Sequence, residues 1–234
     1  MRNNLYVPKI NETRLISVEK WFSSQETQLS KFLNKLDLLK YEPISYDLKN
    51  FSLSVQALIG LEYRSRFLIY KIHEFLKNNP TILKQISYDI NLSIDKLVLE
   101  KLIKKITDET HRIMPAQLIV NKTVSNEFIL CDRPVIDLDD SKCYIVGRRK
   151  LINIQKSDER NSNIRFGSED AKFVDIFNHQ LALQARDWIL SSNELLLNRY
   201  IELINSNEYK ESLKKDRIEI VRAKHLTTEY EIID

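Results

Sequence analysis

Glycine and proline are scarce in this chain, and their scarcity limits its fold more than any other feature of the sequence. Of the 234 residues, only 3 are glycine and 5 are proline. β-Sandwiches and barrels need many tight turns, which these two residue types largely supply. The composition therefore disfavours an all-β fold and favours long helices. Glycines at positions 60, 147 and 167 alone leave no place for a glycine-rich phosphate loop, so ATP-driven or dinucleotide chemistry is not expected.

The length fits one large domain or two small ones, and it is sufficient to bury a sizeable core. We expect a single domain over 1–234. Its helical half would cover about 12–112 and its sheet-plus-helix half about 116–206. The segment 207–234 is expected to be a tail, either a late strand or a disordered end.

The charge and the cysteines indicate a cytoplasmic protein. A net charge of +3 and a pI near 8.7 are only mildly basic, which is a weak sign of a polyanionic partner. No apolar leader follows Met1, and no run of 18 apolar residues occurs, so no membrane contact is predicted. We expect Cys131 and Cys143 to be free thiols. Because no Cys/His spacing resembles a zinc site, neither a metal nor a cofactor is predicted.

Apolar residues recur at helical spacing throughout the first half. The pattern predicts three helices, over 16–40, 47–77 and about 81–112, with a kink near Asn91 in the third. Each of them is followed by a proline that ends it: Pro43, Pro80 and Pro115.

The second half begins with short segments rich in Val, Ile, Tyr and Phe, separated by turn-like residues. They are "AQLIVNKTV", "EFILC", "KCYIVG" and "KLINIQK". They predict a small antiparallel sheet over about 116–156, and hence a mainly helical α+β fold. The polar stretch 157–170 predicts a mobile loop, with Ser168 as the N-cap of a helix over 169–190. Another helix is expected over 194–206.

Asn178 stands out on the helix predicted over 169–190. At 100° per residue it lies about 40° from Val174, in the middle of the apolar face. A buried amide needs hydrogen-bond partners, because leaving it unpaired costs roughly 1–3 kcal/mol. Asn178 would then either hold backbone of the sheet near 128–135 or face a polar pocket.

Arg64 is the corresponding exception on the helix predicted over 47–77. It lies at the edge of that helix's apolar stripe, where its stem can cover the core while its guanidinium meets a carboxylate. Asp132 is the expected partner. It opens the triplet Asp132-Arg133-Pro134, which ends the strand of "NEFILCDRPVIDLDD" at 126–140. The triplet is either a shaped strand break, held by Asn178 and Arg64, or part of an active site.

These residues fall within a larger pattern of boxes: "LYVPK" (5–9), "VEKWFSSQETQLSKFLNKL" (18–36), "YRSR" (63–66), "FILCDRPV" (128–135) and "FNHQLALQARDWILSS" (177–192). In order and spacing they resemble the bacterial domain-of-unknown-function family 4238 over most of the chain. The positions that match the family's polar or turn residues are Tyr6, Pro8, Arg64, Asp132, Pro134 and Asn178.

The sequence also departs from the family pattern. Leu5 stands where the family usually has histidine, and Cys131 stands in place of serine. Arg133 replaces asparagine, and Arg66 replaces proline. If the family's activity uses that histidine, this chain is inactive or works differently. By analogy alone, the resemblance implies a role in bacterial genetic conflict.

Three functions are compatible with these residues. The leading hypothesis is an accessory or interaction protein of an antiphage or toxin-type system, with a protein partner from the same operon. The second is a nuclease-like enzyme on RNA or DNA, with Arg64, Asp132 and Asn178 at its centre. In that case Arg133, Arg148 and Arg149 would contact phosphate. The third is a small-ligand sensor whose pocket the same cluster lines.

Overall fold

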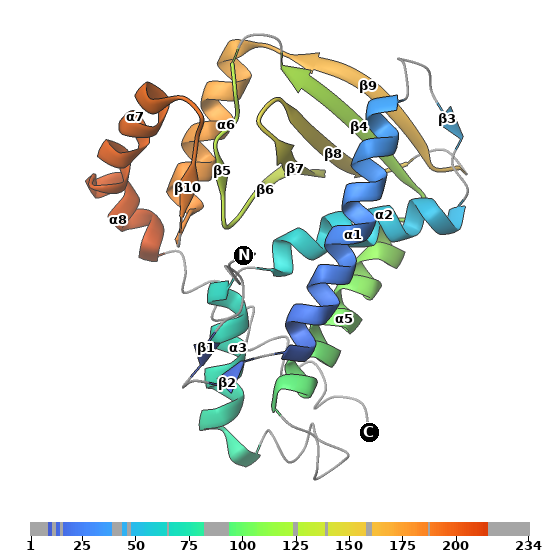
Figure 1. Ribbon diagram of the computed structural model, residues 1–234, viewed down its shortest axis with the longest axis vertical. Helices are drawn as coiled ribbons and strands as arrows, with labels where there is room; N and C mark the ends of the chain where they lie inside the picture. The colour runs from blue at the N-terminus through green and yellow to red at the C-terminus, as the bar shows by residue number, and fades with distance from the viewer. Residues whose placement is uncertain are drawn as a thin grey trace, which may run out of the picture.

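The computed structural model describes residues 9–10, 13–14, 16–38, 44–45, 48–64, 66–81, 94–123, 126–138, 140–157, 161–186 and 188–214. Its fold is α+β, with helices in the first half and most of a mixed sheet in the second (Figure 1). The opening box with Leu5, Tyr6 and Pro8 lies outside these residues, as do the expected kink near Asn91 and the tail from 215 onward.

Seven helices occur among the described residues: α1 (Ile16–Leu38), α2 (Leu48–Tyr63), α3 (Arg66–Asn78), α5 (Ile94–Ile113), α6 (Ala171–Gln184), α7 (Glu194–Ile204) and α8 (Asn207–Lys214). The helices predicted over 16–40 and 194–206 are confirmed as α1 and α7. The one predicted over 47–77 is in fact two helices, α2 and α3. The apolar stripe continues across their junction, so periodicity alone could not reveal the break.

The main sheet has six strands in the order β3-β9-β4-β8-β7-β6. They are β3 (Ile44–Ser45), β4 (Ala116–Thr123), β6 (Val135–Leu138), β7 (Ser141–Gly147), β8 (Lys150–Lys156) and β9 (Asn163–Glu169). The expectation of a purely antiparallel sheet is wrong, because β4 and β9 pair in parallel. The successive strands β8 and β9 run in opposite directions, and β4 lies between them, antiparallel to β8. β9 must therefore run parallel to β4.

Strand β9 occupies part of the stretch 157–170, which the sequence predicts as a loop. It is polar because most of its side chains are exposed or half-buried, and Ile164 is its one fully buried residue. Ser168 lies within this strand and is not the N-cap of the next helix. Asp170 is the cap instead, since its side chain accepts a 2.8 Å hydrogen bond from the Phe173 amide.

Two short strand pairs lie outside the main sheet. β1 (Lys9–Ile10) pairs with β2 (Thr13–Arg14), and β5 (Leu130–Cys131) pairs with β10 (Ile189–Leu190). The helix predicted over 169–190 ends earlier than expected, at Gln184, and Ala185 is already extended. Trp188 and Ile189 are therefore not part of its apolar face, and the chain turns back as β10 to pair with β5.

The main sheet is the middle layer between two groups of helices (Figure 1). Successive residues of β7 point to opposite faces of the sheet. Tyr144 packs in the core with α1, α2 and α5, whereas Cys143 and Ile145 pack in the core with α6 and α7. Two hydrophobic cores result, one on each face of the sheet. None of the helices in the described part of the chain combines the length and apolar character that a membrane span requires.

Candidate functional site

Asn178 lies in the second core and is only 1% exposed. Its side-chain oxygen accepts a 2.8 Å hydrogen bond from the Ile129 amide, and its side-chain nitrogen donates one of 2.9 Å to the Glu127 carbonyl. The predicted burial of Asn178 and its bonding to the adjoining backbone are therefore confirmed. One side-chain amide thus pairs two backbone groups of the segment that leads into β5, while the Phe128 amide between them donates to the Arg148 carbonyl at 2.7 Å.

The expected strand break is present. β5 ends at Cys131, β6 begins at Val135, and the chain bends between them. Gln184, the last residue of α6, donates from its side-chain amide to the carbonyls of Arg133 (2.5 Å) and Val135 (2.9 Å). Helix α6 therefore fixes this backbone at two points, through Asn178 before the break and through Gln184 within it.

Asp132 also stabilises the strand break. One of its carboxylate oxygens accepts a 3.0 Å hydrogen bond from the Arg186 amide, just beyond the end of α6. The other is buried and has no hydrogen-bond partner in the described part of the chain. Cys131 donates through its thiol to the Arg133 carbonyl at 3.1 Å. A thiol thus makes here the type of contact that a serine hydroxyl can also make.

The predicted ion pair between Arg64 and Asp132 is not formed. Arg64 directly follows α2 and pairs with Glu26 of α1, while Asp132 contacts the segment after α6. The reason is the layered fold, because α1 and α2 pack on one face of the sheet, and β5 packs with α6 in the other core. Arg64 does meet a carboxylate from the edge of its apolar stripe, but the carboxylate belongs to the neighbouring helix.

Arg186 closes the C-terminal end of α6, and sequence reasoning missed it. Its guanidinium donates to the carbonyls of Leu183 (2.8 Å), Ala185 (2.8 Å) and Ser212 (3.3 Å). The Tyr209 hydroxyl, from α8, donates to the Ala185 carbonyl at 2.9 Å. Carbonyls at a helix end need such partners, and a cation there also opposes the helix dipole. The segment 207–214, assigned to the tail from sequence, is thus a helix with a capping role.

Arg186→Ala is expected to lower the free energy of unfolding by roughly 1–2 kcal/mol, because it leaves helix-end carbonyls without their donor. Urea unfolding followed by circular dichroism measures this. Arg199→Ala on α7 is the matched control. The exposed Arg199 guanidinium lies 5.7 Å from the centre of the Tyr200 ring, and this contact involves no helix-end carbonyl. Equal midpoints for both variants would contradict the capping role.

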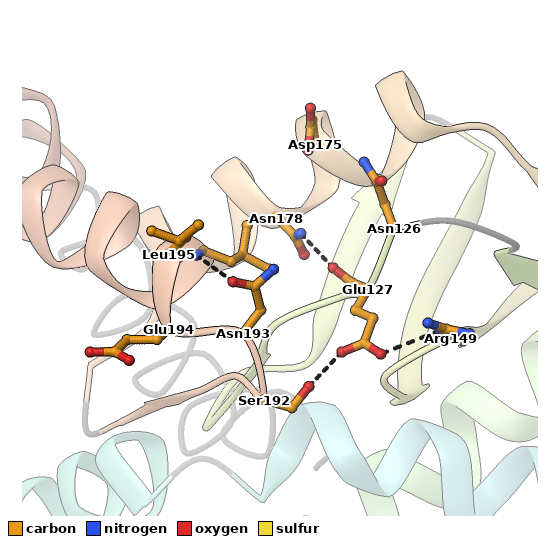
Figure 2. Close-up of a pocket in the computed structure, with 10 residues that line it drawn as sticks. Asn126, Glu127, Arg149, Asp175, Asn178, Ser192, Asn193, Glu194 and Leu195 are labelled. Carbon is orange, nitrogen blue, oxygen red and sulfur yellow. Dashed lines mark hydrogen bonds and ion pairs between the residues drawn. The ribbon is translucent and has the colours of Figure 1, made fainter.

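A pocket of about 630 Å³ opens where α6, the start of α7 and the segment before β5 meet (Figure 2). The residues that line it are mostly polar: Asn126, Glu127, Arg149, Asp175, Asn178, Ser192, Asn193, Glu194, Leu195 and Leu196. Of the residues proposed from sequence, Asn178 and Arg149 are in this lining. Arg64, Asp132 and Arg133 are not, so the structure does not bring the proposed catalytic residues together around one cavity.

Glu127 organises one wall of the pocket. Its carboxylate accepts a 2.6 Å hydrogen bond from the Ser192 hydroxyl and lies 3.3 Å from Arg149 and 3.8 Å from Arg148. The bond from Ser192 and the two arginines lower the pKa of Glu127. Both arginines that were candidates for phosphate contacts are therefore next to a carboxylate, with which a phosphate would have to compete.

Asp175 and Glu194 are the other acids of the pocket. Neither forms a side-chain hydrogen bond or an ion pair with another described residue. The N-terminus of α7 beside them already has a cap, because the Asn193 side chain accepts a 3.2 Å hydrogen bond from the Leu196 amide. This part of the pocket therefore presents negative charge.

A second group of charged residues, here called the ionic cluster, joins the helices of the first half to the sheet. The Lys142 amine of β7 lies 2.5 Å from the Glu62 carboxylate of α2 and 3.3 Å from Asp137 of β6. Burial raises the pKa of Glu62. Burial opposes the charge of Lys142, but Glu62, Glu109 and Asp137 together outweigh it and raise the pKa of that amine. The raised pKa of Lys142 follows from three carboxylates around one ammonium group, whereas that of Glu62 follows first from its burial.

The buried end of the ionic cluster contains two tyrosines. The Tyr63 hydroxyl donates a 2.6 Å hydrogen bond to one oxygen of Glu109. The other oxygen of Glu109 and the Tyr144 hydroxyl are buried, and neither has a hydrogen-bond partner in the described ranges. Burial raises the pKa of Tyr144. No group of three or more His, Cys, Asp or Glu residues suited to a metal ion occurs within the described residues.

Both cysteines are free thiols, as expected, and both are buried. Burial raises the pKa of Cys131 to about 12, and it does the same for Cys143. Thiols held in this protonated state are weak nucleophiles and weak metal ligands. Cys131 and Cys143 therefore serve packing and, in the case of Cys131, the strand break.

Comparison of the chain with protein-family models, curated proteins and solved structures finds no match. The resemblance to family 4238 stays a prediction from the sequence.

Proposed function

We propose that the protein is an interaction module that binds a protein partner through its α6–β10–α7 region. The observation that carries this proposal is the distribution of exposed apolar side chains. Six large ones are exposed among the described residues: Leu53, Leu138, Ile176, Leu190, Leu195 and Ile201. The last four belong to α6, β10 and α7, a short stretch of the chain, and we call them the apolar group.

Exposed apolar side chains on adjoining elements commonly mark binding surfaces, and α6 and α7 adjoin because both contribute to the second core. Leu195 is 82% exposed and lies on the pocket, so an apolar contact and polar groups are presented together. An apolar centre with polar surroundings is the usual composition of a protein interface. The leucine does not cover the core of its own chain, and a partner would remove it from water.

The biological setting follows from the sequence. The resemblance to family 4238 supports an accessory role in a bacterial genetic-conflict system, antiphage or toxin-type. The partner would be a protein from the same operon. The nuclease-like alternative has less support, because Arg64 and Asp132 contact different layers of the fold.

Co-purification from the native operon tests the proposal. The chain is tagged, its flanking genes are expressed with it, and the operon products that remain bound are quantified. Leu195→Asp is expected to reduce their recovery at least tenfold, since it places a charge where an apolar contact forms. Leu138→Asp is the matched control, because Leu138 is exposed at the end of β6, outside the apolar group.

Circular dichroism and urea unfolding must show that both variants are folded. Unchanged recovery in the Leu195 variant, or an equal loss in both variants, would contradict this interface. Phage infection or toxicity assays on the same strains then show whether loss of binding also removes the biological effect.

A further inference from the structure

We propose that the partner binds the pocket through a basic segment, with an apolar side chain on Leu195 and cationic side chains at Asp175 and Glu194. This inference rests on the proposed function and adds the chemistry of the partner. All three residues line the same pocket, and in the view of Figure 2 the Leu195 side chain lies between those of the two acids. A partner that covers the leucine therefore brings its neighbouring residues towards carboxylates.

The charges of the pocket select a cation at this end. Glu127 is engaged by Ser192, Arg148 and Arg149, so its negative charge is already compensated. Asp175 and Glu194 have no cation of their own among the described residues. A partner that supplies lysine or arginine would complete two ion pairs, whereas an acidic partner or a phosphate would meet repulsion.

The N-terminus of α7 does not reverse this preference. Free helix amides attract anions, but here the Asn193 side chain accepts from the Leu196 amide, and Glu194 adds an acid in the first turn. The cap and the acid together satisfy the positive end of the helix from within the chain.

The polar lining of the pocket also favours a peptide segment. At about 630 Å³ the pocket is larger than one side chain needs, and Leu195 and Leu196 are the apolar residues of its otherwise polar lining. Small-molecule sites are mostly apolar and enclosed, with only a few polar groups. A polar wall with one exposed leucine at its edge suits a segment that alternates basic and apolar side chains.

Titration of the isotope-labelled full chain with short peptides, followed by NMR, tests this inference. The probe is acetylated and amidated Gly-Arg-Leu-Arg-Gly. The comparison probes are Gly-Glu-Leu-Glu-Gly, Gly-Arg-Ser-Arg-Gly and inorganic phosphate. The basic apolar peptide is expected to shift the Leu195 amide and the Asn193 side-chain amide at the lowest concentration. Its affinity should fall when salt is raised, because exposed ion pairs are screened.

Charge-neutralising substitutions give the second measurement. The double variant Asp175→Asn/Glu194→Gln is expected to weaken binding of the basic peptide by roughly twofold to thirtyfold, the range of two solvent-accessible ion pairs. Asp108→Asn/Asp140→Asn is the matched control, since both of these acids are exposed on other elements. A stronger response to the acidic peptide or to phosphate, or no response to any probe, would overturn the inference.

The two proposals fail in different ways. If Leu195→Asp abolishes co-purification while Asp175→Asn/Glu194→Gln leaves it intact, the interaction surface stands and the basic segment is refuted. If Leu195→Asp leaves co-purification intact while the basic peptide still binds the pocket, the proposed interface is refuted and a cation-binding pocket remains.

Discussion

Asn178→Leu is expected to lower the free energy of unfolding by about 2–4 kcal/mol. Leucine is similar in size but can satisfy neither the Ile129 amide nor the Glu127 carbonyl, both of which Asn178 bonds. These backbone groups would be left unpaired around a side chain that is 99% buried, so each incurs its desolvation cost. Urea unfolding at neutral pH measures the difference.

Asn178→Asp makes this prediction more specific. Aspartate keeps an acceptor for the Ile129 amide but loses the donor to the Glu127 carbonyl, and it buries a charge. We expect a loss at least as large as for leucine at neutral pH, and a partial recovery in acid, where the carboxyl group is protonated. Asp175→Asn on the same helix is the control, because this half-buried carboxylate bonds no backbone group among the described residues, and it should unfold like the parent.

The same variants distinguish a structural Asn178 from a catalytic one. Asn178→Leu and Asp132→Asn are assayed for both stability and biological activity. If both lose stability and activity falls only with the folded fraction, the residues hold the strand break. Full stability together with abolished activity would instead identify an active site.

Lys142→Met is expected to lower the free energy of unfolding by about 3 kcal/mol, because it leaves the carboxylate of Glu62 largely buried without its cation. Removing one partner of a buried ion pair lowers the free energy of unfolding by more than the intact pair contributes to it, because the remaining charge stays buried and unpaired. The double variant Glu62→Met/Lys142→Met should therefore recover most of the loss. Thermal or urea unfolding of the parent, the single variant and the double variant measures these differences.

The loss in Lys142→Met should also depend on pH. Burial already raises the pKa of Glu62 above its ordinary value of 4.5, and without the ammonium group it should rise further. A carboxyl group with a raised pKa in the folded state contributes its stability below the unfolded pKa and loses it as pH increases through the folded value. The deficit relative to the parent should therefore be small near pH 4.5 and larger at pH 7 to 8. A deficit that grows in acid would contradict the role of Glu62.

Much of the local structure around the strand break could be predicted from the sequence. Pro134 cannot donate to a sheet ladder, so an interruption after Cys131 followed from its covalent structure. Asn178 is polar in the middle of an apolar stripe, which predicted both its burial and its bonds to nearby backbone. In both cases the decisive property belongs to a single residue and its immediate neighbours.

Other parts could not be predicted because their cause lies elsewhere in the chain. β9 is a strand because β4 offers it an edge, although its own composition is that of a loop. Helix α6 ends at Gln184, although no helix-breaking residue marks that position. Arg186 and Tyr209 donate hydrogen bonds to the carbonyl of Ala185 at this end. The partner of Arg64 is Glu26 because α1 and α2 pack together.

The sequence by itself determined where most helices form, that the chain is α+β, that the strand breaks at Asp132-Arg133-Pro134, and that Asn178 is buried. These features depend on periodicity and on covalent limits, which act over a few residues. Only the tertiary structure decided the order and direction of the strands, the partners of the charged residues and the pocket between α6 and α7. Those features depend on which helices and strands pack together. The free energy of that packing comes from apolar burial and charge contacts between segments distant in the chain.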